Sequence, residues 1–263
     1  MNGFHRYTIG VKYKTGWEDR LPGDNTYIHS GSYGDMIFGL PAVIASGGGT
    51  YYVWEGLYMG IGKLLEAQPY IKEVKVLSAE EWKKLKDENR VTHDLDKFRA
   101  TDKLHVVEMH LAAFNLTFDL TQPYIFNIPP NKVAKIVVND TGRQRFPGST
   151  LDWKLLKPHE KDCVFLGIAT DRYWFEHDRP YLNIPWYEVK DIYEFARVIA
   201  GADLFVGNMS IGHTIAEGLK IPFALDVYVG RPSYPLSTSG HVCLTDEIFY
   251  WYLETPLPKK DKQ

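Results

Sequence analysis

Two loops rich in small residues each precede a helical segment, and the later one spans residues 207–214. An apolar run of strand length, residues 202–206, leads into it, and Ile215 and Leu219 continue with helical spacing. A strand that turns sharply into a helix presents free backbone N–H groups and the positive end of the helix dipole. Such a turn suits the diphosphate of a nucleotide, but it is equally typical of any α/β protein.

The side chains of this loop decide what could approach it. Ser210, Gly212 and Thr214 are small, and we expect them to keep the path to the backbone N–H groups open. Glu217, one turn further into the predicted helix, could accept hydrogen bonds from a sugar hydroxyl. The loop is therefore a candidate site for a nucleotide diphosphate with its ribose.

The earlier loop, residues 30–35, follows the strand-like residues 27–29 and precedes an apolar helical segment over 36–44. Gly31 and Gly34 permit backbone conformations closed to other residues and let a substrate come close. Asp35 falls in the first helical turn, where the helix dipole favours its ionised form. There it could act as a general base toward a hydroxyl group, or it could simply cap the helix.

Strand-like and helix-like segments alternate along the chain. Ser78 and Glu81 have the spacing of a capping box at a helix start, and residues 104–109 fit a strand or a helix equally well. The alternation predicts an α/β protein with parallel sheets covered by helices. Further strands are expected at 50–54, 74–77, 133–139, 163–167 and 221–225, and further helices at 57–67, 191–199 and 245–253.

Consecutive prolines within residues 127–131 interrupt regular structure and suggest a boundary between two α/β halves. A length of 263 residues suits two domains of roughly 100–150 residues each. The formal net charge of −3 gives no general attraction to nucleic acid or anionic membranes. With only two cysteines, no apolar run long enough to span a bilayer and no signal-peptide pattern, we expect a cytoplasmic protein with free thiols.

The two loops, in this order and at domain spacing, resemble those of GT-B glycosyltransferases, especially the family 9, ADP-heptose:lipopolysaccharide heptosyltransferase-like group. The resemblance rests on Gly34-Asp35 with Leu40-Pro41-Ala42, on the strand and loop of residues 202–210, and on Lys220-Ile221-Pro222. It implies two Rossmann-like α/β/α domains facing a cleft. Residues 1–128 would form the acceptor-side domain, 129–240 the nucleotide-sugar-binding domain, and 241–263 a C-terminal helix and tail.

The resemblance also implies roles for single residues. Asp35 would be the catalytic base on the acceptor hydroxyl, with Gly31, Ser32 and Gly34 shaping the loop around it. Arg143 and Arg145 would stabilise the leaving nucleoside diphosphate. The donor would be bound by Asn208, Ser210, Ile211, Gly212, His213, Thr214, Glu217 and Thr141. The aspartate that the family usually carries in the later loop is absent here, and the histidine is offset by one position, so the donor sugar stays open.

We therefore expect an inverting glycosyltransferase that needs neither metal nor cofactor. Its partners would be a nucleotide-sugar donor and an acceptor, either a glycan or a hydroxylated base in DNA. Asp94 and Asp96 form a DxD pattern, but without a preceding strand it is expected to be a turn or part of the acceptor wall rather than a metal site. Two alternatives remain: a nucleotide-sugar epimerase of the same fold, and a catalytically silent nucleotide-sugar-binding or scaffold protein.

Overall fold

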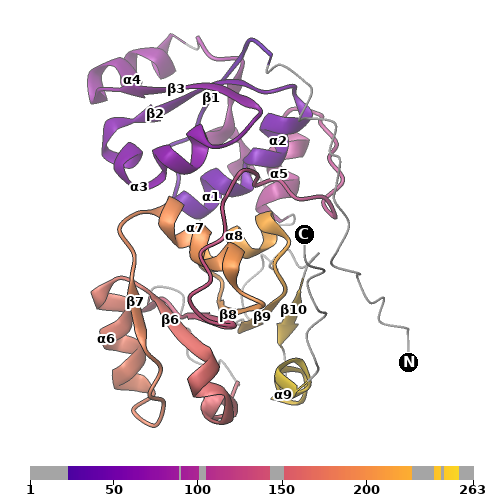
Figure 1. The fold of residues 1–263 in the computed structure, drawn as a ribbon. Coiled ribbons are helices and arrows are strands. Elements are labelled where there is room, and N and C mark those ends of the chain that lie inside the picture. Colours follow the sequence, from indigo (N-terminus) through magenta and orange to yellow (C-terminus); the bar gives the residue numbers. More distant parts are fainter. Residues whose placement is uncertain are drawn as a thin grey trace.

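A computed structural model describes residues 23–88, 90–100, 105–142, 151–226, 240–243 and 246–254 (Figure 1). Their strands form two sheets, in which neighbouring strands pair in parallel. The first sheet has the order β3 (Ile71–Leu77), β2 (Gly49–Trp54), β1 (Asn25–Ile28) and β4 (His93–Asp94). The second has the order β10 (His241–Cys243), β9 (Phe223–Asp226), β8 (Leu204–Asn208), β5 (Ile136–Asn139), β6 (Cys163–Gly167) and β7 (Trp186–Glu188).

Helices connect successive strands, as parallel pairing requires. In the first half these are α1 (Tyr33–Phe38), α2 (Leu40–Ala45), α3 (Glu55–Glu66), α4 (Ala79–Asp87), the 3-10 helix η1 (Leu95–Ala100) and α5 (Val106–Ala113). In the second half they are the 3-10 helix η3 (Trp153–Asp162), α6 (Ala169–Asp178), α7 (Ile192–Gly201), α8 (Ile211–Leu219) and α9 (Asp246–Glu254). The predicted α/β class with two Rossmann-like halves is confirmed.

Several predicted local signals are found in the structure. Ser78 and Glu81 form the expected capping box at the start of α4. In the ambiguous segment 104–109, residues 106–109 are helical, because His105 caps α5 and Glu108 completes a second capping box. The helix expected over 36–44 is instead two short helices that meet at Gly39. Because a new helix begins after Gly39, Pro41 lies in the first turn of α2, where proline is tolerated.

Four strands of the second sheet are buried on both faces. Every residue of β5, β6, β8 and β9 is buried, which explains why these strands are continuous apolar runs rather than alternating ones. Residues 241–243 extend this sheet by pairing with β9, so the segment after 240 contributes a strand as well as the predicted helix.

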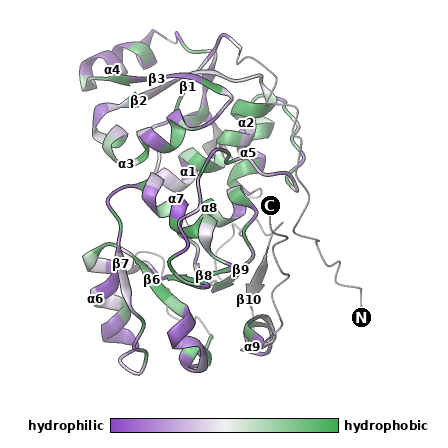
Figure 2. Cartoon of the chain, viewed as in Figure 1, coloured by the Kyte–Doolittle hydropathy of each residue, from purple (hydrophilic) through white to green (hydrophobic). Residues whose placement is uncertain are grey.

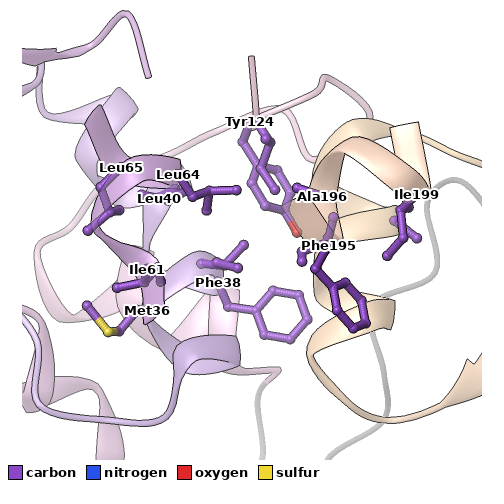
Figure 3. Packing of buried hydrophobic residues seen from close by; sticks show 14 of the residues in the cluster. Met36, Phe38, Leu40, Ile61, Leu64, Leu65, Tyr124, Phe195, Ala196 and Ile199 are labelled. Carbon is purple, nitrogen blue, oxygen red and sulfur yellow. The ribbon is translucent and has the colours of Figure 1, made fainter. Parts of the chain in front are cut away.

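A continuous apolar cluster joins the two halves. Figure 2 shows hydrophobic colour on α2, α5 and α8, whereas α4 and α6 are more hydrophilic. In Figure 3, Phe38 of α1 and Leu64 of α3 lie opposite Phe195 and Ala196 of α7. Tyr124, from the connection between α5 and β5, belongs to the same cluster. Among the described residues, no helix is both long and apolar enough to cross a membrane.

Candidate functional site

Asp35 is the third residue of α1, immediately after the loop that follows β1. The Ser32 side chain caps the helix by accepting the Asp35 backbone N–H at 3.5 Å, and its hydroxyl donates to Asp35 Oδ2 at 3.1 Å. The carboxylate is half-buried and lies near the positive end of the helix. Asp35 therefore both terminates the loop and remains accessible, a position that suits a general base.

The loop that precedes α8 is held by side chains at the carboxyl ends of β5 and β8. Asn208 Nδ2 donates to Asp140 Oδ1 at 2.5 Å and to the Thr141 carbonyl at 3.0 Å. The Thr141 N–H donates in return to Asn208 Oδ1 at 3.3 Å, and the Ser210 hydroxyl donates to Asn139 Oδ1 at 2.8 Å. Asn208 is buried, so in this state its amide fixes the loop rather than facing a ligand.

Gly212 differs from its predicted role of keeping the approach to α8 open. A side chain there would bring its Cβ within 2.6 Å of Phe205 Cζ and 3.1 Å of Asn139 Oδ1. The missing side chain thus faces the sheet, where it allows α8 to pack closely on β8. Ser210, half-buried at the helix N-cap, is the residue of this loop that keeps a small side chain on the accessible side.

The two loops, 180 residues apart in sequence, come together in space. A Cβ at Gly34 would lie 3.3 Å from Thr214 Oγ1, so the first turn of α1 contacts the first turn of α8. Near this contact, the rings of Phe38 and His213 pack edge to face, with their centres 5.9 Å apart. The loop that carries Asp35 and the first turn of α8 are therefore neighbours in the fold.

Buried histidines lie behind the junction of the two loops. Burial lowers the pKa of His105 to about 3, assisted by the nearby His213. Burial likewise lowers the pKa of His110 to about 3, with the neighbouring His29 adding to the effect and a hydrogen bond to the Asp35 backbone opposing it. These rings are neutral at physiological pH, and the full burial of His110 and half-burial of His105 fit a structural role.

Glu217 is not placed with the loop residues. It is fully buried at the seventh position of α8, and its carboxylate pairs with Lys220 Nζ. Lys220 also donates to the Leu120 carbonyl at 2.7 Å and lies 5.4 Å from the Tyr124 ring centre. The contact between Glu217 and the donor ribose stays a prediction. The Glu217 carboxylate that this contact requires is already paired with Lys220.

Arg143 and Arg145 lie outside the described residues. A different cation is found at the neighbouring sheet edge, where Arg179 Nη1 lies 2.8 Å from Asp140 Oδ2. Arg179 follows α6, and its guanidinium also stacks 4.4 Å from the Trp153 ring centre. Arg179 stands 39 positions after Asp140 with no motif to connect the two, so this contact could not be predicted from the sequence.

Asp94 of the DxD pattern lies in the short strand β4, which the sequence had not predicted, and Asp96 follows that strand. The contacts of both aspartates lie within the fold. Asp96 is engaged by Lys86 and by Ser30, as a structural turn would require. Across the part of the chain that the structure describes, no group of three or more histidine, cysteine or acidic side chains could hold a metal ion.

Comparison with solved structures identifies the fold. Neither a family profile nor a curated protein sequence matches the chain. A family 9 glycosyltransferase from Veillonella parvula DSM 2008 superposes with a TM-score of 0.60 at 12% identity, covering 93% of this chain and 92% of that one. E. coli heptosyltransferase WaaC, solved with ADP-2-deoxy-2-fluoro heptose, superposes at 0.53 with 14% identity, covering 87% and 98%.

E. coli ADP-heptose lipopolysaccharide heptosyltransferase II gives a TM-score of 0.53 at 12% identity, covering 85% of this chain and 92% of that one. These similarities extend over both sheets rather than over one half. The chain therefore has the two-part α/β fold of the family 9 glycosyltransferase and heptosyltransferase structures.

Proposed function

We propose that this protein is a glycosyltransferase that moves a sugar from a nucleotide-sugar donor to an acceptor hydroxyl. The observation that supports the proposal is the contact between Gly34 and Thr214, which brings the loop of the half-buried Asp35 beside the start of α8. The similarity of the whole fold to glycosyltransferase structures supports the same assignment. Fold alone does not decide function, so the assignment depends on the chemistry of this site.

The donor diphosphate would lie against the first turn of α8. The first backbone N–H groups of a helix lack partners within the helix and carry its positive partial charge. In the proposed complex, the N–H groups of Ile211, Gly212 and His213 would face the phosphates. The hydroxyls of Ser210 and Thr214 now donate to Asn139 Oδ1 and to the Ser210 carbonyl, and they would exchange these partners to add hydrogen bonds to the donor. Asn208 and Thr141 contribute by fixing the loop through the bonds that they exchange.

Asp35 would take the proton from the acceptor hydroxyl. The acceptor oxygen then forms a bond to the anomeric carbon of the donor sugar as the bond from that carbon to the diphosphate breaks. Attack opposite the leaving group inverts the anomeric configuration, the proton stays on Asp35, and the nucleoside diphosphate leaves. Gly31, Ser32 and Gly34 would leave room for the acceptor beside the carboxylate.

Leaving-group stabilisation is assigned to the α8 dipole together with Arg143 and Arg145, without a metal ion. Preorganised donors and cations can stabilise a developing diphosphate charge in this way. The acceptor would be a glycan or a hydroxylated base in DNA, and we place the reaction in the cytoplasm. ADP-sugars are the first donors to try, because two of the structural neighbours are named for ADP-heptose or solved with its analogue.

The test is a turnover assay with a panel of ADP-, UDP-, GDP- and CMP-linked sugars, each with saccharide and hydroxylated-DNA acceptors. We expect release of free nucleotide together with a glycosylated product, unchanged by a metal chelator. An epimerised sugar nucleotide without nucleotide release would identify the epimerase alternative. Donor binding without any turnover would identify a silent binding protein, and loss of turnover in chelator would refute the metal-free mechanism.

A further inference from the structure

The loop that carries Asp35 is anchored by a residue from a distant segment. Asp96, in η1, accepts the Ser30 backbone N–H on Oδ1 at 2.9 Å and the Ser30 hydroxyl on Oδ2 at 2.6 Å. Both carboxylate oxygens are thus used on one residue of the loop. Since Ser30 precedes Asp35 by five residues, this anchor lies at the start of the segment that ends at the candidate base.

The anchor is itself fixed from two further elements. Lys86 of α4 forms an ion pair with Asp96, and His29 Nδ1 lies 3.2 Å from Asp96 Oδ1. The Asp96 backbone N–H donates to Asp94 Oδ1 at 3.1 Å, which fixes the turn that presents the side chain. Burial alone would raise the pKa of Asp96, but the neighbouring His29 ring and the hydrogen bonds from Lys86 and Ser30 outweigh it and hold the pKa well below the usual range.

The contacts continue from the anchor to Asp35. The Gly31 N–H donates to His29 Nδ1 at 2.8 Å, and a Cβ at Gly31 would lie 2.4 Å from His29 Cε1 and 3.2 Å from Asp35 Oδ2. Ser32 then caps α1 and donates to Asp35 Oδ2. Ser30 is therefore held by Asp96, Gly31 by His29, and Ser32 by its contacts with Asp35.

We propose that Asp96 is a positioning residue for Asp35, holding the loop of residues 30–32 so that the Asp35 carboxylate keeps its place beside the acceptor. This inference rests on the proposed function. Asp96 does not touch the substrate in this scheme; it acts through Ser30 and the capping contacts of Ser32. Asp96 of the DxD pattern, for which no metal-binding role is expected, thereby has a role in positioning the catalytic base.

The test compares Asp96→Asn with Asp24→Asn, a matched substitution at a carboxylate that is 92% exposed and pairs with Lys72 on the surface. The asparagine retains one acceptor for the Ser30 N–H but loses the charge that binds Lys86. We expect Asp96→Asn to lower kcat between about tenfold and a hundredfold, the range for a misplaced catalytic group. Donor affinity should stay unchanged, because α8 binds the donor, and Asp24→Asn should leave both quantities unchanged.

The decisive measurement repeats the substitution in an Asp35→Asn background. If Asp96 acts through Asp35, adding Asp96→Asn to Asp35→Asn lowers the residual rate no further. An independent, multiplicative loss, or an unchanged kcat in the single variant, would overturn the positioning role. If Asp35→Asn itself keeps full turnover, the proposed function fails instead, so the two failures are distinguishable.

If Asp96→Asn fails to fold, a milder substitution at Ser30 still tests the positioning role of Asp96. Ser30→Ala removes only the hydroxyl contact to Asp96 Oδ2 at an exposed position and leaves the backbone contact in place. It should lower kcat in the same direction by a smaller factor, again with donor affinity unchanged. An unchanged kcat in correctly folded Ser30→Ala would count against the anchor.

Discussion

Asp35 and Glu217 are carboxylates on helices that follow small-residue loops, yet the structure treats them differently. Asp35 is in the first turn of α1, half-buried, and accepts a hydrogen bond from Ser32. Glu217 is two turns into α8, fully buried, and paired with Lys220. The position of a carboxylate along its helix thus affects what it can do. Asp35, in the first turn, stays accessible to a ligand, whereas Glu217, further along, is turned into the core.

Replacing Asp35 with asparagine should give the largest effect. We expect turnover to fall about 10²- to 10⁴-fold, the usual contribution of a general base. Because the side chain is half-buried and keeps its size, the protein should remain folded and bind donor normally. The measurement is kcat with donor affinity determined separately. Wild-type turnover in Asp35→Asn would remove Asp35 from the mechanism and with it one side of the comparison.

Glu217→Gln tests the other carboxylate. Breaking a buried ion pair leaves Lys220 uncompensated, and we expect a loss of about 3–5 kcal/mol in the free energy of unfolding. The double variant Glu217→Gln with Lys220→Met should recover part of that loss, as measured by urea denaturation. Donor affinity should be unchanged in the folded protein. Weaker donor binding by correctly folded Glu217→Gln would show that Glu217 contacts the ribose, as predicted from the sequence.

The histidines behind Asp35 predict acid sensitivity. The pKa of His105 and of His110 is lowered to about 3 in the fold, whereas an unfolded histidine has a pKa near 6.5. The unfolded chain therefore takes up protons first, so stability is fully present above about pH 6.5 and is lost as the pH falls toward 3. One such histidine accounts for roughly 3 kcal/mol at pH 4.

His110→Phe should flatten this dependence when the free energy of unfolding is measured between pH 7 and pH 4. His177→Phe, at a side chain that is 62% exposed, is the matched control and should leave the slope unchanged. An equal slope in wild type and His110→Phe would mean that His110 is not held neutral by the fold.

The glycines of the two loops should give the smallest effects. Gly212→Ala forces a Cβ to within 2.6 Å of Phe205, and overpacking of this kind costs about 1–3 kcal/mol. Gly34→Ala meets only Thr214 Oγ1 at 3.3 Å, so its cost should stay below about 1 kcal/mol. Thermal unfolding separates the two variants. A larger loss in Gly34→Ala than in Gly212→Ala would reverse the assignment of which glycine serves packing.

Sequence patterns were sufficient for much of the fold and for the location of the two loops. Apolar runs identified β5, β6, β8 and β9, and capping residues marked the start of α4, because these signals are local. The 3-10 helices and the edge strands β4, β7 and β10 were not predicted, since short elements carry little periodicity and depend on their neighbours.

The candidate site was predictable only in part, for a physical reason. Small residues and an acidic first turn are visible along the chain, so the loops around Asp35 and Ser210 could be found. The direction in which Gly212 and Glu217 face, and the long-range partners Asp96 and Arg179, depend on tertiary packing. Contacts between segments 40 or more positions apart leave no trace in a single sequence.

The apolar cluster that Phe38, Tyr124 and Phe195 share has a consequence for cooperativity. Since helices of both sheets bury their faces in one cluster, neither half can lose its structure without exposing apolar surface of the other. The Tyr124 and Ile125 N–H groups also donate to the Gly218 carbonyl, so the connecting segment is tied to α8. Heat should therefore melt both sheets in a single calorimetric transition. A fragment produced by cutting the connecting segment would expose the apolar surface of this cluster to solvent and should tend to aggregate.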